Sequence, residues 1–229
     1  MIVVVGGIKG GSGKTTISTN LTVMRAATGK KVLLVDADEQ KSASGFANQR
    51  DVLGIKTLWS TIQLSGKTIN SQINRLKPDY DDIIIDVGGR DTTSQRSALA
   101  IADVYLIPFK PRSYDVWTIG DVKTIISEMK TVNPNLKAFA FINQGDPTGS
   151  DNEEACKILE ECEELKCLNL TIGHRKIFGN SSSDGLGIFE VKNSDKKALE
   201  EMQKLHDEVY GKSVQIKYQK VPKKYMYCI

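Results

Sequence analysis

The chain has 229 residues, of which 40% are hydrophobic and 26% charged, with a formal net charge of +3. This composition is typical of a soluble globular protein and excludes a disordered or fibrous one, and the length fits one domain, since single cores grow to about 250–300 residues. No stretch holds the roughly 20 apolar residues that span a bilayer, so we expect no transmembrane helix.

Apolar, β-branched segments alternate with helical patterns along the chain. Strands are predicted at 2–5, 32–35, 83–87, 104–108, 138–142 and 168–172. Helices are predicted at 15–28, 60–76, 92–101, 115–131, 152–165 and 194–210. Nearly continuous apolar strands are typical of parallel strands that are covered on both faces. The alternation therefore predicts an α/β fold with a doubly wound, mostly parallel sheet, helices on both faces, and ligands at the carboxyl ends of the strands.

A glycine-rich segment, Lys9-Gly10-Gly11-Ser12-Gly13-Lys14-Thr15-Thr16, lies between the first predicted strand and the first predicted helix. In that context glycines let backbone N–H groups turn inward around a phosphate, and the start of the helix adds the positive end of its dipole. We expect the Lys14 ammonium between the β- and γ-phosphates of ATP and the Thr15 hydroxyl on Mg²⁺. The residues expected to bind the nucleotide here are Gly10, Gly11, Ser12, Gly13, Lys14, Thr15 and Thr16.

This loop departs from the standard G-x-x-x-x-G-K-[ST] pattern, because Ile8 takes the first glycine position and Lys9 adds a second lysine. In this it resembles the deviant Walker A P-loop ATPases of the ParA/MinD family, whose loop reads KGGxGKT. The resemblance covers about residues 1–210. It implies that Lys9 reaches across an ATP-sandwich homodimer to the partner's phosphates. A second cation is redundant for one nucleotide's own cradle, which agrees with that role.

Two strand ends extend the resemblance. Residues 32–40 look like the family's strand ending in DxDPQ, with Glu39 in place of the proline. This implies that Asp36 orients the attacking water and approaches the Mg²⁺ shell. Residues 81–86 look like a Walker B strand, which implies that Asp86 holds Mg²⁺ through a water, since Mg²⁺ keeps much of its hydration shell. The expected catalytic residues are thus Lys9, Lys14 and Asp36, and the expected metal residues are Thr15, Asp36 and Asp86.

Later matches to the family are weaker. Asn143 ends a predicted strand where relatives use an asparagine on the adenine edge, although a turn asparagine is common there in any case. Arg175 and Glu190 resemble residues of a late loop that covers the base. Only two histidines are present, and neither belongs to a Ser–His–Asp arrangement near the loop, so the sequence does not indicate acyl-transfer catalysis. Positioning and charge neutralisation are then the expected means of catalysis, which predicts slow basal ATP hydrolysis stimulated by a partner.

The resemblance is greatest to short ParA-type partition ATPases. It implies plasmid or chromosome segregation, in which the ATP-bound homodimer binds non-specific DNA and a ParB-like protein triggers hydrolysis. The expected location is the cytoplasm, with association to the nucleoid in the ATP state. A MinD-like membrane-associated positioning ATPase is an alternative, and a bacterial tyrosine kinase is another, because four of the seven tyrosines lie at 210, 218, 225 and 227.

A basic tail, 211–229, is predicted to follow the ATPase domain at 1–210. It holds five lysines and no acid, and the rest of the chain has 26 basic against 28 acidic residues. Such a segment suits DNA phosphates, although a merely solubilising tail or a strand paired with a sheet edge fits equally well. Pro222 and the period-two pattern of 214–222 disfavour an amphipathic membrane helix, so no stable membrane association is expected.

The four cysteines form no C-x-x-C pair. We therefore expect ordinary reduced cysteines with no metal or redox role. Three of them lie in or just after an acidic segment, 151–164, which has seven acids and one lysine and indicates a solvated helix face.

Overall fold

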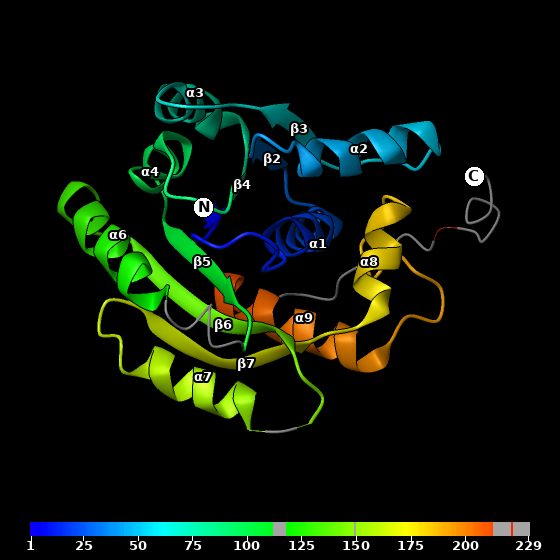
Figure 1. Ribbon diagram of the computed structural model, residues 1–229. Helices are drawn as coiled ribbons and strands as arrows, with labels where there is room; N and C mark the ends of the chain where they lie inside the picture. The colour runs from blue at the N-terminus through cyan, green and yellow to red at the C-terminus, as the bar shows by residue number, and fades with distance from the viewer. Residues whose placement is uncertain (112–117, 149, 213–220, 222–229) are drawn as a thin grey trace.

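A computed structural model of the chain describes residues 1–111, 118–148, 150–212 and 221 (Figure 1). Within them, seven strands form one sheet in the order β3-β2-β4-β1-β5-β6-β7, and every pairing between neighbours is parallel. The strands are β1 (Ile2–Val5), β2 (Val32–Ala37), β3 (Ser60–Gln63), β4 (Asp82–Val87), β5 (Val104–Phe109), β6 (Lys137–Gly145) and β7 (Lys166–Gly173).

Helices cover both faces of this sheet. The face that packs on Val3 and Val5 of β1 is covered by α1 (Lys14–Ala27), α2 (Ser42–Val52), α8 (Lys176–Ser183) and α9 (Lys196–Tyr210). The opposite face, under Ile2 and Val4, is covered by α3 (Thr68–Leu76), α4 (Thr93–Leu99), α6 (Ile119–Val132) and α7 (Asp151–Glu160). A short 3₁₀ turn, Lys77–Asp79, follows α3.

The two-sided cover explains why the strands read as unbroken apolar runs. Successive strand residues point to opposite faces, and both faces of β1, β2 and β4 are fully buried. Each face therefore needs its own set of Val, Ile and Leu side chains. The predicted doubly wound α/β fold is confirmed, with an all-parallel sheet among the described residues.

The prediction of one helix at 60–76 was wrong. Residues Ser60–Gln63 form the edge strand β3, and the helix begins only at Thr68. Gly66, with φ of 63°, separates the two elements in a left-handed conformation that a helix cannot contain. Strand 60–63 is only half-buried, so it lacks the long apolar run that marked the other strands.

Other helix boundaries also differ from the predictions. The segments that form α2 and α8 were not predicted as helices, because both are rich in Ser, Asn and Gly and lack a strong apolar period. The predicted helix 152–165 ends at Glu160, after which Cys162 and Leu165 turn into the core. The predicted helix at 115–131 is α6, and its first residues, 115–117, lie outside the described part of the chain.

The parallel arrangement brings the carboxyl ends of β1, β2, β4 and β6 to the same edge. β1 is central, and Asp36 of β2 is in register with Asp86 of β4. No helix within the described residues is long and apolar enough to cross a membrane. Residues 213–220 and 222–229 of the predicted basic tail lie outside the described residues.

Candidate functional site: a phosphate-binding loop at the carboxyl edge of the sheet

The glycine-rich loop connects the end of β1 to the first turn of α1. Gly13 is the N-cap of α1 and has φ of 85°, a left-handed conformation that glycine adopts without strain. Lys14 is buried, and its Nζ donates a hydrogen bond to the Lys9 carbonyl at 2.7 Å, so its ammonium is folded back along the loop. The Lys9 side chain is exposed at the outer end of the same loop.

Two consecutive amides from the end of β6 hold this loop. The Asn143 amide nitrogen donates to the Ser12 carbonyl at 2.7 Å, and the Gln144 amide nitrogen donates to the Gly11 carbonyl at 3.0 Å. Asn143 is buried, and Gln144 has a left-handed φ of 56°, which is uncommon for a residue with a side chain. Because the Ser12 and Gly11 carbonyls accept these hydrogen bonds, the N–H groups of the loop are left to face an anion.

The loop is also contacted from β4 and β5. A Cβ built on Gly89 would lie 2.8 Å from the backbone of Lys9 and Gly10, so this position accepts only glycine without movement. A Cβ on Gly11 would lie 3.6 Å from the Lys110 Nζ, which places a further lysine beside the loop. Three cationic side chains, those of Lys9, Lys14 and Lys110, thus surround the loop.

Asp86 is fully buried beneath the start of α1. Its two carboxylate oxygens accept hydrogen bonds from the Thr15 hydroxyl at 2.7 Å and from the Ser18 hydroxyl at 2.8 Å. Burial raises the pKa of Asp86 to about 7, and the nearby Asp36 and Asp38 carboxylates add to this, while the two hydroxyl donors oppose it. A buried carboxyl group in this state is stabilised by a neighbouring cation.

These groups fit Mg²⁺. The ion prefers hard oxygen ligands and is usually held by one or two carboxylates together with substrate phosphates and waters. Thr15 and Asp86 supply a hydroxyl and a carboxylate directly below the phosphate-binding loop. Thr15 and Asp86 would hold Mg²⁺ there, and the ion would neutralise phosphate charge when bound.

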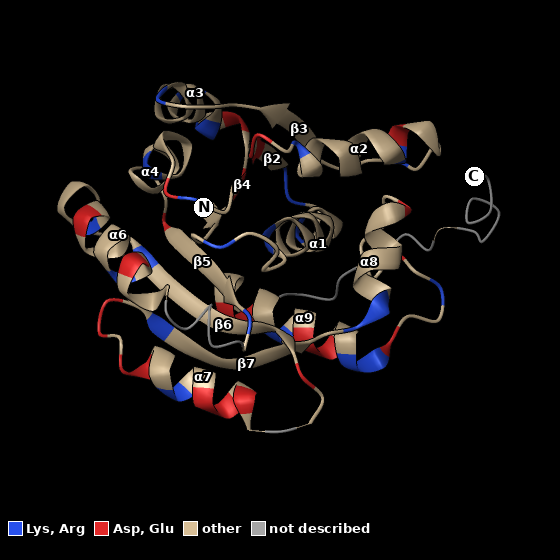
Figure 2. Ribbon diagram, viewed as in Figure 1, with Lys and Arg blue, Asp and Glu red and all other residues tan. Residues whose placement is uncertain are grey.

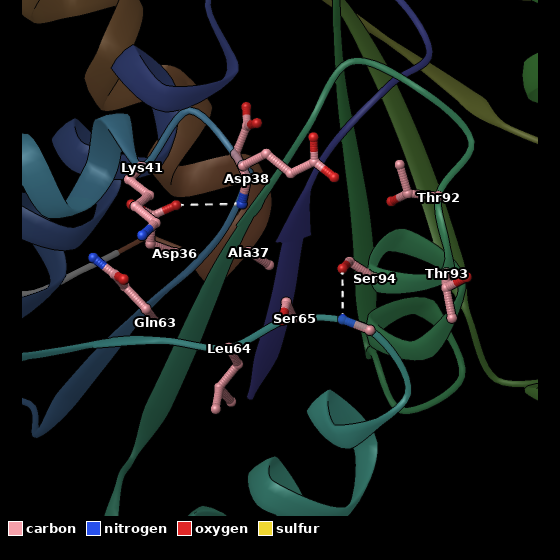
Figure 3. A pocket seen from close by; sticks show the side chains of 12 residues that line it. Asp36, Ala37, Asp38, Lys41, Gln63, Leu64, Ser65, Thr92, Thr93 and Ser94 are labelled. Atoms are coloured by element: carbon pink, nitrogen blue, oxygen red, sulfur yellow. Dashed lines mark hydrogen bonds between the residues drawn. The ribbon is translucent and has the colours of Figure 1, made fainter.

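Asp36 is the penultimate residue of β2 and is held by backbone groups. Its oxygens accept from the Ser44 N–H at 2.7 Å and the Asp38 N–H at 3.3 Å, so the start of α2 fixes its orientation. A cavity of about 670 Å³ opens beside it (Figure 3). The labelled walls of this cavity come from the end of β2 and the loop after it, from Gln63 at the end of β3 with Leu64 and Ser65 after it, and from Thr92, Thr93 and Ser94 at the start of α4.

The late residues Arg175 and Glu190 have structural partners. Arg175 pairs with Glu201 of α9. Glu190 accepts two hydrogen bonds from the buried Arg50 of α2, at 2.7 and 3.0 Å, and Arg50 also lies over the Trp59 ring. These contacts connect α2 to the segment after α8.

The structure therefore brings together the loop 9–16, Asp36, Asp86 and Asn143 at one edge of the sheet. Sequence reasoning assigned no role to Ser18, Ser44, Gln144 or Lys110. Ser18 could have been found, because it lies three residues after Thr15 and hence on the same helix face. Gln144 and Lys110 reach the site from elements that are distant in the sequence, whereas Ser44 lies at the start of the helix that follows Asp36.

The fold and this loop define a nucleotide-binding protein of the P-loop class. Residues 3–188 match the family of the CobQ/CobB/MinD/ParA nucleotide binding domain, and the chain belongs to that family. The maintenance of carboxysome distribution protein A of Halothiobacillus neapolitanus is 26% identical over 90% of this chain and 94% of that protein. The sporulation initiation inhibitor protein Soj of Bacillus subtilis is 30% identical over 58% of this chain and 66% of that protein.

Solved structures show the same fold. McdA of Cyanothece in a complex with ATP superposes with a TM-score of 0.77 at 16% identity, over 94% of this chain and 98% of that one. MinD of Aquifex aeolicus superposes with a TM-score of 0.70 at 21% identity, over 94% and 99% of the two chains. The expected membership of the ParA/MinD ATPases is confirmed, and with it a nucleotide-binding site of the ATPase type.

Proposed function

We propose that this protein is an ATP-dependent dimerising switch that hydrolyses ATP slowly and partitions or positions a cargo by binding non-specific DNA. The observation that supports this proposal best is that two lysines of one loop differ in burial and in contacts. Lys14 is buried and folded along its own loop, whereas the Lys9 side chain is exposed at the outer end. A cation in that position suits the polyphosphate of a second, facing subunit.

Slow, partner-stimulated turnover is part of this proposal. Asp36 is the residue proposed to orient the attacking water, and both of its oxygens are already engaged by backbone N–H groups. Such a carboxylate is suited to positioning a water, and positioning with charge neutralisation is most of what phosphoryl transfer requires. Asn143 remains the residue proposed for the adenine edge, in addition to its contact with Ser12.

A candidate DNA surface lies around the starts of α8 and α9. The lysines there are exposed and come from three separate segments (Figure 2): Lys176, Lys192, Lys196 and Lys197. Lysines gathered on one surface gain affinity for DNA by releasing counterions from its phosphates. Lys212, the first lysine of the predicted basic tail, is exposed as well.

The relatives support cargo positioning of this kind. One is named for maintaining carboxysome distribution and another is the chromosome-partitioning ATPase Soj of Thermus thermophilus, which is 24% identical over 58% of this chain. For this protein we propose a plasmid or chromosome as cargo and a ParB-like DNA-bound protein as the stimulating partner. The proposed location is the cytoplasm, on the nucleoid in the ATP state.

The dimerisation step is tested with two lysine variants. Lys14→Ala should lose nucleotide binding, because it removes the cation folded within the loop. Lys9→Ala should bind ATP and remain a monomer in light-scattering measurements with a slowly hydrolysed ATP analogue. Lys110→Ala is the matched control, since it removes a cation beside the same loop. A Lys9→Ala protein that still dimerised with ATP would contradict the sandwich arrangement.

The DNA step is tested by binding to unrelated DNA with ADP, ATP or the analogue across a salt series. We expect binding in the ATP state alone, with log Kobs falling by about 0.9 per phosphate contact for each tenfold rise in salt. Charge reversal of Lys192, Lys196 and Lys197 should lower both affinity and slope, whereas reversal of the exposed Lys30 and Lys31 should not. No binding in any state, with binding to anionic liposomes instead, would favour a MinD-like role. Phosphorylation of the protein's own tyrosines by ATP would favour the alternative of a bacterial tyrosine kinase.

A further inference from the structure

Two cysteines from neighbouring elements meet on the face of the sheet that α7 covers. Cys156 of α7 and Cys167 at the start of β7 are free thiols whose Sγ atoms lie 3.2 Å apart. Both are half-buried, so small reagents can reach them. A disulfide has an S–S bond of about 2.05 Å, so bond formation requires closure by roughly 1 Å. This pair could not be found from the sequence, because no C-x-x-C spacing joins the two cysteines.

We propose that Cys156 and Cys167 form a thiol–disulfide exchange site that a neutral or cationic low-molecular-weight disulfide oxidises to an intramolecular disulfide. In the first step the Cys156 thiolate attacks one sulfur of the reagent, and one reagent thiolate leaves. In the second step Cys167 attacks the Cys156 sulfur of the mixed disulfide, and its proton goes to the second departing thiolate. The two protein thiols are oxidised, and one reagent disulfide is reduced to two thiols.

The surroundings set the order of these steps. Burial, together with the hydrogen bond to Cys156, raises the pKa of the Cys167 thiol to about 12, so Cys167 is a poor first nucleophile. Cys156 lies at the outer side of the pair, where its Sγ is 3.5 Å from the Asn169 Oδ1. The third cysteine in this region, Cys162, is buried, and its Sγ contacts the Glu164 carboxylate at 3.4 Å.

The charge of α7 selects the reagent. The segment 151–164 holds seven acids and one lysine, and the acidic ribbon of α7 is visible in Figure 2. The Glu160 carboxylate, one of these acids, lies 4.0 Å from the Cys156 Sγ. A dianionic disulfide such as oxidised glutathione is repelled by this field, whereas a dicationic one such as cystamine is attracted. The difference is largest at low salt, because the Debye length falls from about 10 Å at 0.1 M to about 3 Å at 1 M.

The disulfide would lie far along the strand from the nucleotide site. Cys167 is the second residue of β7, at the amino end, whereas the phosphate-binding loop and its partners lie at the carboxyl ends of the strands. Oxidation would join α7 to β7 across 11 residues of sequence. It should raise the melting temperature by about 5 to 10 °C and leave the affinity for ATP unchanged within twofold.

The test treats the full chain with cystamine or with oxidised glutathione and maps the products by non-reducing tryptic digestion. Cleavage after Lys157 and Lys166 places the three cysteines on separate peptides, 138–157, 158–166 and 167–175. We expect peptide 138–157 linked to peptide 167–175, with the loss of two hydrogens. Cystamine should react several-fold faster than oxidised glutathione at low salt, and the ratio should approach one at high salt.

Matched variants make the outcome decisive. The double variant Cys162→Ser/Cys228→Ser keeps the proposed pair and should still form the link. Cys167→Ser should stop at a stable cystamine adduct on peptide 138–157. The proposal is overturned if peptide 158–166 takes part in the main link, if wild-type protein keeps the adduct without closing, or if links form between chains. Equal rates for the two reagents at low salt would overturn the selection by charge.

Discussion

Replacement of Gly13 by alanine tests how the phosphate-binding loop is held. Gly13 has φ of 85°, and a Cβ there would clash with the amide nitrogen of Asn143. The left-handed backbone alone costs a residue with a Cβ about 1–2 kcal/mol. Displacing the Asn143 amide breaks its hydrogen bond to the buried Ser12 carbonyl, which adds about 1–3 kcal/mol. Gly13→Ala should therefore lower the free energy of unfolding by about 2–5 kcal/mol.

A second glycine separates the cost of the left-handed backbone from the cost of the lost Asn143 hydrogen bond. Gly29, after the end of α1, has the same φ of 85°, but a Cβ there would meet nothing within 4 Å. Gly29→Ala should therefore cost only the backbone term, about 1–2 kcal/mol. In an Asn143→Ala background the clash with the Asn143 amide is absent, and only the Gln144 Nε2, 3.2 Å from the added Cβ, stays close, so Gly13→Ala should cost only slightly more than Gly29→Ala.

Urea unfolding of the four variants without nucleotide measures these differences. The difference between the cost of Gly13→Ala in the wild type and in the Asn143→Ala background should be about 1–3 kcal/mol, the value of the lost amide contact. The reasoning is refuted if Gly13→Ala costs no more than Gly29→Ala, or if its cost is the same with and without Asn143.

Three further predictions concern buried charged or titratable groups. Asp86→Asn removes a buried charge whose pKa is raised from 3.8 to about 7. The substitution should raise the free energy of unfolding at pH 8 by up to about 4 kcal/mol. It should also abolish the extra stabilisation that ATP with Mg²⁺ gives, and thermal-shift measurements detect both effects. An unchanged Mg²⁺ dependence would contradict the role of Asp86 in holding the ion. Burial lowers the pKa of His206 below its usual 6.5, so the unfolded chain takes up a proton that the folded protein excludes, and stability should fall as the pH drops below about 6.5. The groups around His206 are Asp207, Arg25, Asp82 and Tyr210. His206→Gln should reduce this fall, and an unaltered pH profile would be inconsistent with it. Arg50→Met leaves the Glu190 carboxylate buried and unpaired and should cost about 3–5 kcal/mol, whereas Glu190→Gln keeps an acceptor and should cost less; equal costs in urea unfolding would count against the pair.

The phosphate-binding loop was predictable because its chemistry is local. Glycines, Lys14 and Thr15 fall within one short segment between a strand and a helix, and the structure confirms that this segment connects β1 to the first turn of α1. Asp36 and Asp86 were also predictable as strand ends, since each follows or lies in an apolar run. The edge strand β3 was not, because its half-buried residues carry no long apolar signal.

The sequence by itself determined the alternation of strands and helices, the doubly wound fold and the loop, because burial on both faces and phosphate binding each leave a local pattern. Only the tertiary structure decided that β2 lies beside β4, which brings Asp36 into register with Asp86. Burial raises the pKa of Asp86, and the nearby Asp36 carboxylate adds to this rise. The tertiary structure alone also decided the contacts of the Asn143 and Gln144 amides with the loop and of the Cys156 and Cys167 thiols with each other. The physical reason is that these contacts depend on strand order and helix packing, which join residues far apart in the chain.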